Sequence, residues 1–286
     1  MPGRGSSASA PTLSLVIESG DRARRIGRRA GPVVALALLA LVAACAGDTG
    51  GEGTVAAGSP PPRSSSTPSP AHQLDARGFP LPERPDCAAD AGGAFVRATT
   101  SEGNGVGFRL IGTGPGGVVL GPQDNGDICQ WLPYAEELAT TYRVALFDWD
   151  EPRSELPVLA VAALREAGAR KVVMGGASYG GALALSEAYR VRPRLAGVLS
   201  FGGELTLPGF DGRAGIRKWR GPLLALGSQQ DDFFDSQNAR QLRHLHPGPE
   251  TVVMLPGHAH GVDLLDDPRQ ARVRAAVDRF LARVLD

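Results

Sequence analysis

The sequence lacks three features that would each point to a class of protein or partner. It has no excess of charge, because 30 Lys and Arg residues balance 30 Asp and Glu residues. Its aromatic residues, 6% of the chain, are not interleaved with a basic stripe, so a nucleic-acid partner is not expected. Its N-terminal apolar run, residues 31–44, is shorter than the roughly 20 residues that a bilayer-spanning helix needs. With only three cysteines, each one needs its own explanation.

The N-terminal segment is typical of an export signal. Residues 1–30 are polar and basic, the apolar run follows, and small residues lead to Cys45. Residues 42–45, Val-Ala-Ala-Cys, resemble a bacterial lipobox. That resemblance implies cleavage before Cys45, lipid on its thiol, and an exported protein that the lipid attaches to the outer side of the cell membrane, within the envelope. The alternative is an ordinary secretory signal in which Cys45 has no role. We therefore interpret residues 1–44 as a signal peptide.

Residues 45–76 consist mostly of Gly, Ser, Pro, Thr and Ala, with almost no large apolar side chains. Such a segment buries too little surface to offset its ordering entropy, which predicts a disordered tether. Residues 77–286 then form one folded domain. Its two cysteines, Cys87 and Cys129, predict a disulfide in an oxidising compartment. Closing a loop of about 40 residues would stabilise the domain by about 3–4 kcal/mol. The alternative is two free buried thiols.

Within the domain, short apolar runs alternate first with turns and then with helical patterns. Residues 95–98 and 106–111 predict an antiparallel hairpin. From residue 118 onward, strands alternate with helices, which predicts a mostly parallel sheet with helices on both faces. Residues 112–117 match G-x-G-x-x-G, but they open a strand instead of a helix, so we interpret them as a turn and expect no dinucleotide. No cofactor is expected.

The most informative stretch is the G-x-S-x-G pentapeptide at residues 176–180. It follows an apolar β-branched run and precedes a helix-favouring run, which is the context of a nucleophile elbow centred on Ser178. Glycines flank the serine because side chains there would collide within so sharp a turn. The alternative is a Gly- and Ser-rich turn with no chemistry.

An acid and a histidine follow in order, each after a later strand. Asp231 and Asp232 follow the strand at 222–226, and His258 and His260 follow the strand at 251–255. Both loops leave the carboxyl ends of strands, which is the sheet edge that carries the elbow. A metal site of His258, His260 and Asp263 is less favoured, because no third His or Cys lies nearby.

With the serine, the acid and the histidine in this order, residues 94–286 resemble an α/β-hydrolase of the compact serine esterase or dienelactone-hydrolase-like type. The resemblance implies that Ser178 attacks a carbonyl carbon and that His260 transfers the proton. It also implies that Asp231 orients His260. Asp231 is preferred to Asp232 because family loops often read D-x-aromatic. His260 is preferred to His258 because residues 257–261 match G-x-x-H-G.

The oxyanion hole implied by the family uses the backbone N–H of Tyr179 and a second N–H after the strand at 118–120. Here the sequence departs from the family, since many members carry His-Gly at the start of that loop. Pro122 has no N–H, so Gln123 or Asp124 would supply the second donor.

We therefore predict a cell-envelope serine hydrolase, specifically a monomeric carboxylesterase acting on small or exposed esters. Its membrane contact would be the lipid on Cys45. Aromatic residues are candidates to line the site, and the alternative for each is a place in the core or at the rim: Trp149, Tyr179, Phe210, Trp219 and Phe233. Two alternatives stay open: a thioesterase or amidase using the same three residues, and a non-catalytic binding lipoprotein that retains the fold.

Overall fold

The computed structural model describes residues 16–18, 87, 92–149 and 153–286. Apart from residues 16–18, the predicted signal peptide and tether lie outside the described residues, and so does Cys45. Residues 1–20 and 72–286 belong to one compact unit, which contains everything described below. Among the described residues, no helix is both long and apolar enough to cross a bilayer.

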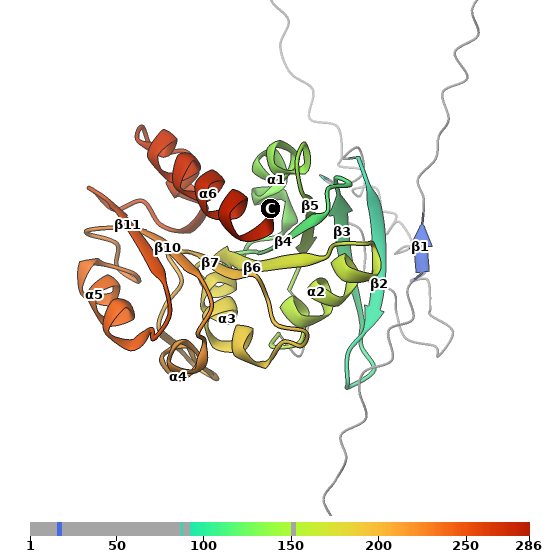
Figure 1. The fold of residues 1–286 in the computed structure, drawn as a ribbon, viewed down its shortest axis with the longest axis horizontal. Coiled ribbons are helices and arrows are strands. Elements are labelled where there is room, and N and C mark those ends of the chain that lie inside the picture. Colours follow the sequence, from blue (N-terminus) through green and yellow to red (C-terminus); the bar gives the residue numbers. More distant parts are fainter. Residues whose placement is uncertain (1–15, 19–86, 88–91, 150–152) are drawn as a thin grey trace, which may run out of the picture. The chain divides into compact units, whose positions relative to one another are not determined.

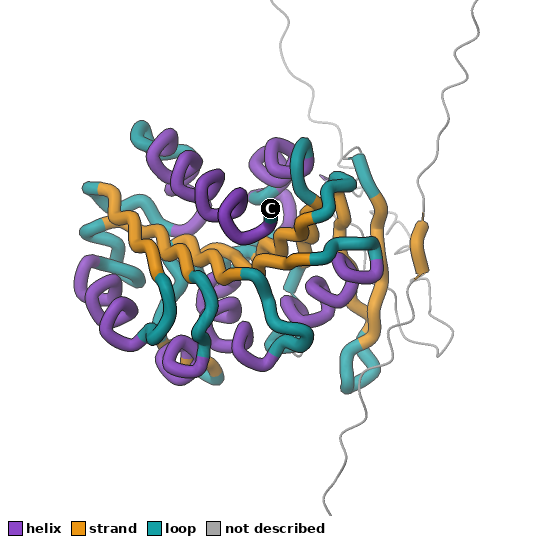
Figure 2. The backbone as a smooth tube through the Cα atoms, in the orientation of Figure 1, coloured by secondary structure: helices purple, strands orange, loops and turns teal. Residues whose placement is uncertain are grey.

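A nine-stranded sheet runs through the molecule, in the order β1-β2-β3-β5-β4-β6-β7-β10-β11 (Figures 1 and 2). The strands are β1 (Val16–Glu18), β2 (Ala94–Thr99), β3 (Gly105–Ile111), β4 (Gly116–Gly121), β5 (Arg143–Phe147), β6 (Lys171–Ala177), β7 (Gly197–Phe201), β10 (Leu223–Ser228) and β11 (Glu250–Leu255). The six strands from β5 to β11 in this order pair in parallel. The predicted hairpin is β2 and β3, with Val96 opposite Phe108. The prediction of a mostly parallel sheet with an antiparallel N-terminal hairpin is confirmed.

Strand β1 pairs antiparallel with β2 at the edge of the sheet. It lies within the predicted signal peptide. Cleavage before Cys45 would therefore remove β1 and leave β2 as the edge strand.

Helices cover both faces of the sheet, as predicted. One apolar core lies between the sheet and α2, α3, α4 and α5, and the other lies between the sheet and α1 and α6 (Figure 1). The helices are α1 (Leu132–Ala139), α2 (Leu156–Glu166), α3 (Tyr179–Glu187), α4 (Gly212–Lys218), α5 (Ser236–Leu245) and α6 (Gln270–Leu285). The short 3₁₀ turns are η2 (Ile128–Gln130), η3 (Ala188–Arg190) and η4 (Gly261–Leu265).

The N-cap of α2 is Glu155, which makes no capping side-chain bond. Helix α4 was not predicted, because its seven residues carry only a weak apolar pattern. They pack against α3 through Gly215, where a β-carbon would lie 2.3 Å from the Leu185 carbonyl oxygen.

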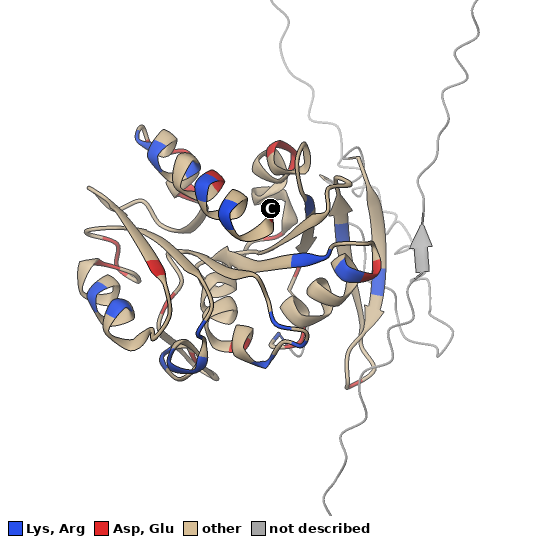
Figure 3. Ribbon diagram, in the orientation of Figure 1, with Lys and Arg blue, Asp and Glu red and all other residues tan. Residues whose placement is uncertain are grey.

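Cationic side chains occupy the last turn of several helices on both sides of the sheet (Figure 3). Examples are Arg165 in α2, Arg217 in α4, Arg243 in α5 and Arg283 in α6. A cation there interacts favourably with the negative end of the helix dipole. Helix α3 begins where β6 ends, so helix C-termini point to the sheet edge opposite Ser178.

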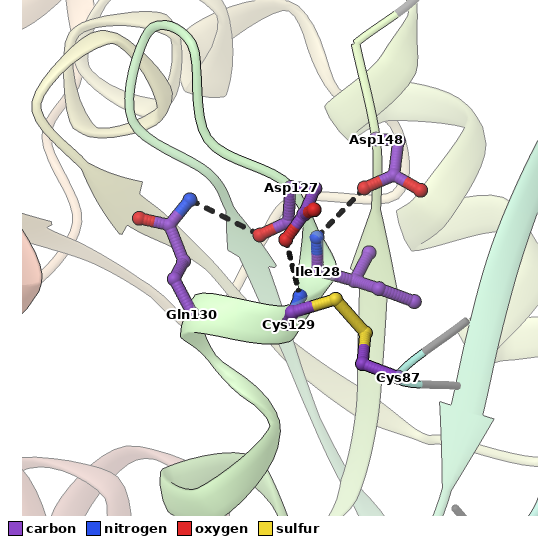
Figure 4. The surroundings of a disulfide bond; sticks show 6 residues. All are labelled: Cys87, Asp127, Ile128, Cys129, Gln130 and Asp148. Atoms are coloured by element: carbon purple, nitrogen blue, oxygen red, sulfur yellow. Dashed lines mark hydrogen bonds between the residues drawn. A yellow bond between two sulfur atoms is a disulfide. The ribbon is translucent and has the colours of Figure 1, made fainter. Parts of the chain in front are cut away.

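The predicted disulfide between Cys87 and Cys129 is present, with Cα atoms 5.7 Å apart and a sequence separation of 42 (Figure 4). Cys129 lies in η2, where Asp127 Oδ1 accepts a hydrogen bond from the Cys129 N–H at 2.8 Å. The Ile128 N–H donates to Asp148 Oδ1 at 2.7 Å. The disulfide thus joins residue 87 to the segment that follows β4, as expected.

Candidate active site

Ser178 occupies a strained turn between β6 and α3. Its φ of 49° and ψ of −113° lie outside the regions that L-residues ordinarily adopt. A β-carbon on Gly176 would lie 2.6 Å from the Gly180 carbonyl carbon, and one on Gly180 would lie 2.4 Å from the Gly121 oxygen. Both flanking glycines are therefore required by close backbone approach, which is the reason the pentapeptide suggested for them.

Asp231 and His260 form a close pair after β10 and β11. His260 Nδ1 lies 2.8 Å from Asp231 Oδ2 and 3.0 Å from Oδ1, and the Asp231 side chain is fully buried. Asp231 Oδ1 also accepts a hydrogen bond from the Phe233 N–H at 2.8 Å. A carboxylate beside Nδ1 favours the tautomer protonated there, which leaves Nε2 as a proton acceptor.

The alternative acid and the alternative histidine differ from the preferred ones in exposure and contacts. Asp232 and His258 are exposed, whereas Asp231 is buried against His260. In the part of the chain that the structure describes, no cluster of three or more His, Cys, Asp or Glu residues could hold a metal ion.

Ser178 and His260 each lie beside the end of β7. The Ser178 N–H donates to the Phe201 carbonyl at 2.8 Å. The next residue, Gly202, has a φ of 61°, and a β-carbon on it would lie 3.0 Å from His260 Nδ1. Among the described residues, no hydrogen bond joins the Ser178 hydroxyl to His260, and His260 Nε2 is buried without a partner. Such bonds are often long before substrate binds.

The segment after β4 contains both candidates for the second oxyanion donor. Its Pro122 carbonyl accepts a hydrogen bond from the Gly180 N–H in the first turn of α3, at 3.0 Å. Asp124 is exposed and pairs with Arg153 at 3.0 Å. The Asp124 carboxylate is therefore directed to a cation.

Aromatic rings border the site on two sides. Trp149, Tyr179 and Phe210 form a row of edge-to-face contacts with centroids 5.1 and 5.4 Å apart. Phe233, 51% exposed, lies 4.8 Å from the His260 ring. Trp219 takes the alternative place: it is 3% exposed and packs in the core, with Nε1 donating to the Pro222 carbonyl.

Sequence reasoning missed two charged residues near the site. The Arg153 guanidinium lies over the Tyr179 and Trp149 rings, at 4.9 and 5.2 Å from their centroids. Glu204 follows β7 at the same sheet edge, and burial raises the pKa of its carboxyl; the nearby His260 opposes this effect and the charge of Asp231 adds to it. Neither residue belongs to a motif. Their positions after strands β5 and β7 were the only available signal.

A cavity of about 410 Å³ lies between α6 and strands β10 and β11, away from Ser178. A second cavity, of about 460 Å³, extends from Arg153 and Phe210 along α3 to Lys218. Two of its lining residues, Arg153 and Phe210, contact the Tyr179 ring, and Ser178, Asp231 and His260 are not among its lining residues.

No protein-family model and no curated protein matches this chain. Solved structures do match. An esterase of Pyrococcus furiosus, Pf2001, has 14% sequence identity and a TM-score of 0.58, covering 73% of this chain and 98% of its own. A thermophilic esterase from Thermogutta terrifontis has 19% identity and a TM-score of 0.55, covering 66% and 97%. An esterase domain from a Rhodothermus marinus protein has 16% identity and a TM-score of 0.55, covering 67% and 98%. At these identities the likeness concerns the fold, which is the α/β-hydrolase fold.

Proposed function

We propose that this protein is a serine hydrolase, specifically a carboxylesterase, that uses Ser178, His260 and Asp231. One observation carries the proposal: the buried Asp231–His260 pair lies at the sheet edge where Ser178 is held in a strained, glycine-flanked turn. Structural strain of this kind is concentrated at functional sites. The esterase names of the structural neighbours agree with this activity.

In the proposed reaction, Ser178 Oγ attacks the ester carbonyl carbon while His260 Nε2 takes the hydroxyl proton. The carbonyl oxygen becomes an oxyanion that accepts hydrogen bonds from the Tyr179 N–H and from the N–H of Gln123 or Asp124. The intermediate collapses, the C–O bond to the leaving group breaks, and His260 returns the proton to the departing alkoxide. Water then hydrolyses the acyl-enzyme by the same steps, releasing the acid and regenerating Ser178.

The short elements between β7 and β10 support small or exposed esters as the substrate class. It contains only the two-residue strands β8 (Thr206–Leu207) and β9 (Phe210–Asp211) and the seven-residue helix α4. These short elements do not form a long amphipathic lid of the kind expected in an interfacial lipase. The exposed Phe233 ring and the row of three aromatic rings offer apolar contacts to such a substrate. Thioesters and activated amides would react by the same steps.

Covalent labelling with a fluorophosphonate probe tests the proposal. The wild-type protein should be labelled, and Ser178→Ala and His260→Ala should abolish labelling while the fold is retained. Matched controls are Ser236→Ala, at the first position of α5, and His258→Ala, exposed two residues before His260; both should be labelled like the wild type. Absence of labelling in the folded wild type would refute the proposed serine hydrolase function.

That result would favour a second candidate, a non-catalytic binding lipoprotein with this fold. Two observations speak for it: the described residues contain no hydrogen bond from the Ser178 hydroxyl to His260, and Pro122 lacks an N–H. In a binding protein, Ser178→Ala would change no catalytic rate.

We also propose that the protein is exported and held at the outer side of the cell membrane by lipid on Cys45. The lipobox-like residues 42–45 and the tether-like composition that follows support this location. Expression with Cys45→Ala tests it. The variant should escape lipoprotein processing and leave the membrane fraction, and an unchanged membrane fraction would contradict the proposal.

A further inference from the structure

We propose that the Gln123 side chain is a positioning residue that holds the oxyanion loop (residues 121–126) against the histidine loop (residues 256–262). This inference rests on the hydrolase function proposed above. It assigns a role to the side chain of a residue for which the sequence suggested only a backbone role.

The first contact joins the two loops directly. Gln123 Oε1 accepts a hydrogen bond from the Val262 N–H at 2.7 Å, across 139 residues of sequence. Val262 is the second residue after His260. Between them, Gly261 has a φ of 56°, and a β-carbon there would lie 1.9 Å from Gln123 Oε1. The amide therefore packs against backbone that only glycine can provide, immediately beside the proposed base.

The backbone of the same residue is held from the other side. The Gln123 carbonyl accepts hydrogen bonds from Trp149 Nε1 at 2.6 Å and from the Gly126 N–H at 3.0 Å. The Trp149 ring also lies edge-to-face with the Tyr179 ring, at 5.1 Å. Trp149 thus contacts both Gln123, through a hydrogen bond to its carbonyl, and Tyr179, through its ring.

These contacts orient both candidate donors. A peptide group is planar, so fixing its carbonyl also fixes the N–H of the following residue. The Pro122 carbonyl is bound by the Gly180 N–H, which fixes the N–H of Gln123. The Gln123 carbonyl is bound by Trp149, which fixes the N–H of Asp124. Donors that are oriented in advance stabilise an oxyanion without reorganisation during the reaction.

The hydrogen bond between the Gln123 side chain and the Val262 N–H then determines the position of the oxyanion donors relative to His260. Removing that hydrogen bond should change the position of His260 relative to the oxyanion donors, although His260 and the donors all remain present. Because the oxyanion exists only in the transition state and intermediate, the loss should appear in kcat and not in KM. A misplacement of about 1 Å can cost about 100-fold in rate.

The test compares three variants of the full domain with p-nitrophenyl butyrate from pH 5 to 9, alongside fluorophosphonate inactivation rates. Gln123→Met keeps the length and removes the acceptor; we expect kcat and the inactivation rate to fall about 10- to 100-fold with KM within about threefold. Gln123→Glu keeps an acceptor for the Val262 N–H, so it should recover most of kcat. Its negative charge near His260 should also move the acid limb of the pH–rate profile to higher pH. The control is Gln130→Met, in the adjoining η2, whose amide donates to the Asp127 carbonyl at 3.1 Å; it should keep kcat within about twofold.

Four results would overturn the inference. If Gln123→Met has the kcat of the wild type, and the wild type reacts with the fluorophosphonate probe, the positioning role is refuted and the hydrolase proposal stays intact. A lowered Tm with unchanged kcat would show a merely structural role. If Gln123→Met does not fold, the Gln123→Glu profile decides, and an unshifted acid limb without recovery of kcat counts against the inference. A folded wild type that neither reacts with the probe nor turns over the ester refutes the hydrolase proposal, and this inference falls with it.

Discussion

Asp148 should make the stability of this protein decrease as pH rises through the weakly acidic range. It follows β5 and lies beside the disulfide, where its Oδ1 accepts the Ile128 N–H (Figure 4). Burial raises the pKa of its carboxyl from 3.8 to about 6, the Ile128 N–H opposes this effect, and the charge of Asp127 adds to it. The folded protein therefore binds this proton more tightly than the unfolded chain does.

The sign of the effect follows directly. Below pH 4 the carboxyl is protonated in both states and its contribution to stability is fully present. Between about pH 4 and 6 the unfolded chain ionises first, so the free energy of unfolding falls as pH rises, and above about pH 6 the loss is complete. The difference between 3.8 and about 6 corresponds to about 3 kcal/mol at 1.36 kcal/mol per pH unit. Because the group is only partly shielded from water, we expect about 1–3 kcal/mol.

Urea unfolding of the wild type and of Asp148→Asn, at pH 4, 5, 6 and 7.5, measures this effect. Asparagine keeps an oxygen for the Ile128 N–H and carries no charge, so the variant should be about 1–3 kcal/mol more stable than the wild type at pH 7.5. The difference should shrink towards pH 4. Asp232→Asn, a change at an exposed carboxyl, should shift stability by less than about 0.5 kcal/mol at every pH. The reasoning is refuted if wild type and Asp148→Asn show parallel pH profiles.

Three further predictions concern single substitutions. Asp231→Asn should lower kcat by about 10²–10⁴-fold because it disturbs the tautomer and charge of the histidine; Asp232→Asn should stay within about twofold, and equal losses in ester-hydrolysis assays would contradict the assignment. Cys129→Ser should lower the free energy of unfolding by about 3–4 kcal/mol in urea under non-reducing conditions, since it opens the loop closed by the disulfide; a change below 1 kcal/mol would contradict this estimate. Gly202→Ala should cost at least tenfold in kcat, because its β-carbon would press on the histidine ring. Gly209→Ala, which also has a positive φ but no atom within 4 Å of the new β-carbon, should lose only about 1 kcal/mol of stability and keep its kcat.

Much of the fold could be predicted because its signals are local. Nearly continuous apolar runs such as residues 172–174 mark strands buried on both faces. The glycines on either side of Ser178 indicate a sharp turn, and that signal is contained within a stretch of five residues. The order of strands in the sheet carried no such signal. Strand β5 lies between β3 and β4, and that neighbour relation depends on pairing between segments far apart in the chain. The place of Trp219 could not be decided for a related reason, since an aromatic residue in a loop gives the same sequence signal whether it lines a site or fills a core.

The sequence by itself determined the class of the protein: a parallel α/β sheet, an elbow at Ser178, and an acid and a histidine after later strands in that order. The tertiary structure alone decided which side chains meet. Asp231 and Asp232 are chemically identical neighbours, and only packing against a loop 29 residues away buries one and exposes the other. The hydrogen bond from Val262 to Gln123 spans 139 residues and follows no motif. Local backbone chemistry depends on neighbours in sequence, whereas a side chain's partners depend on how separate loops converge at one edge of the sheet.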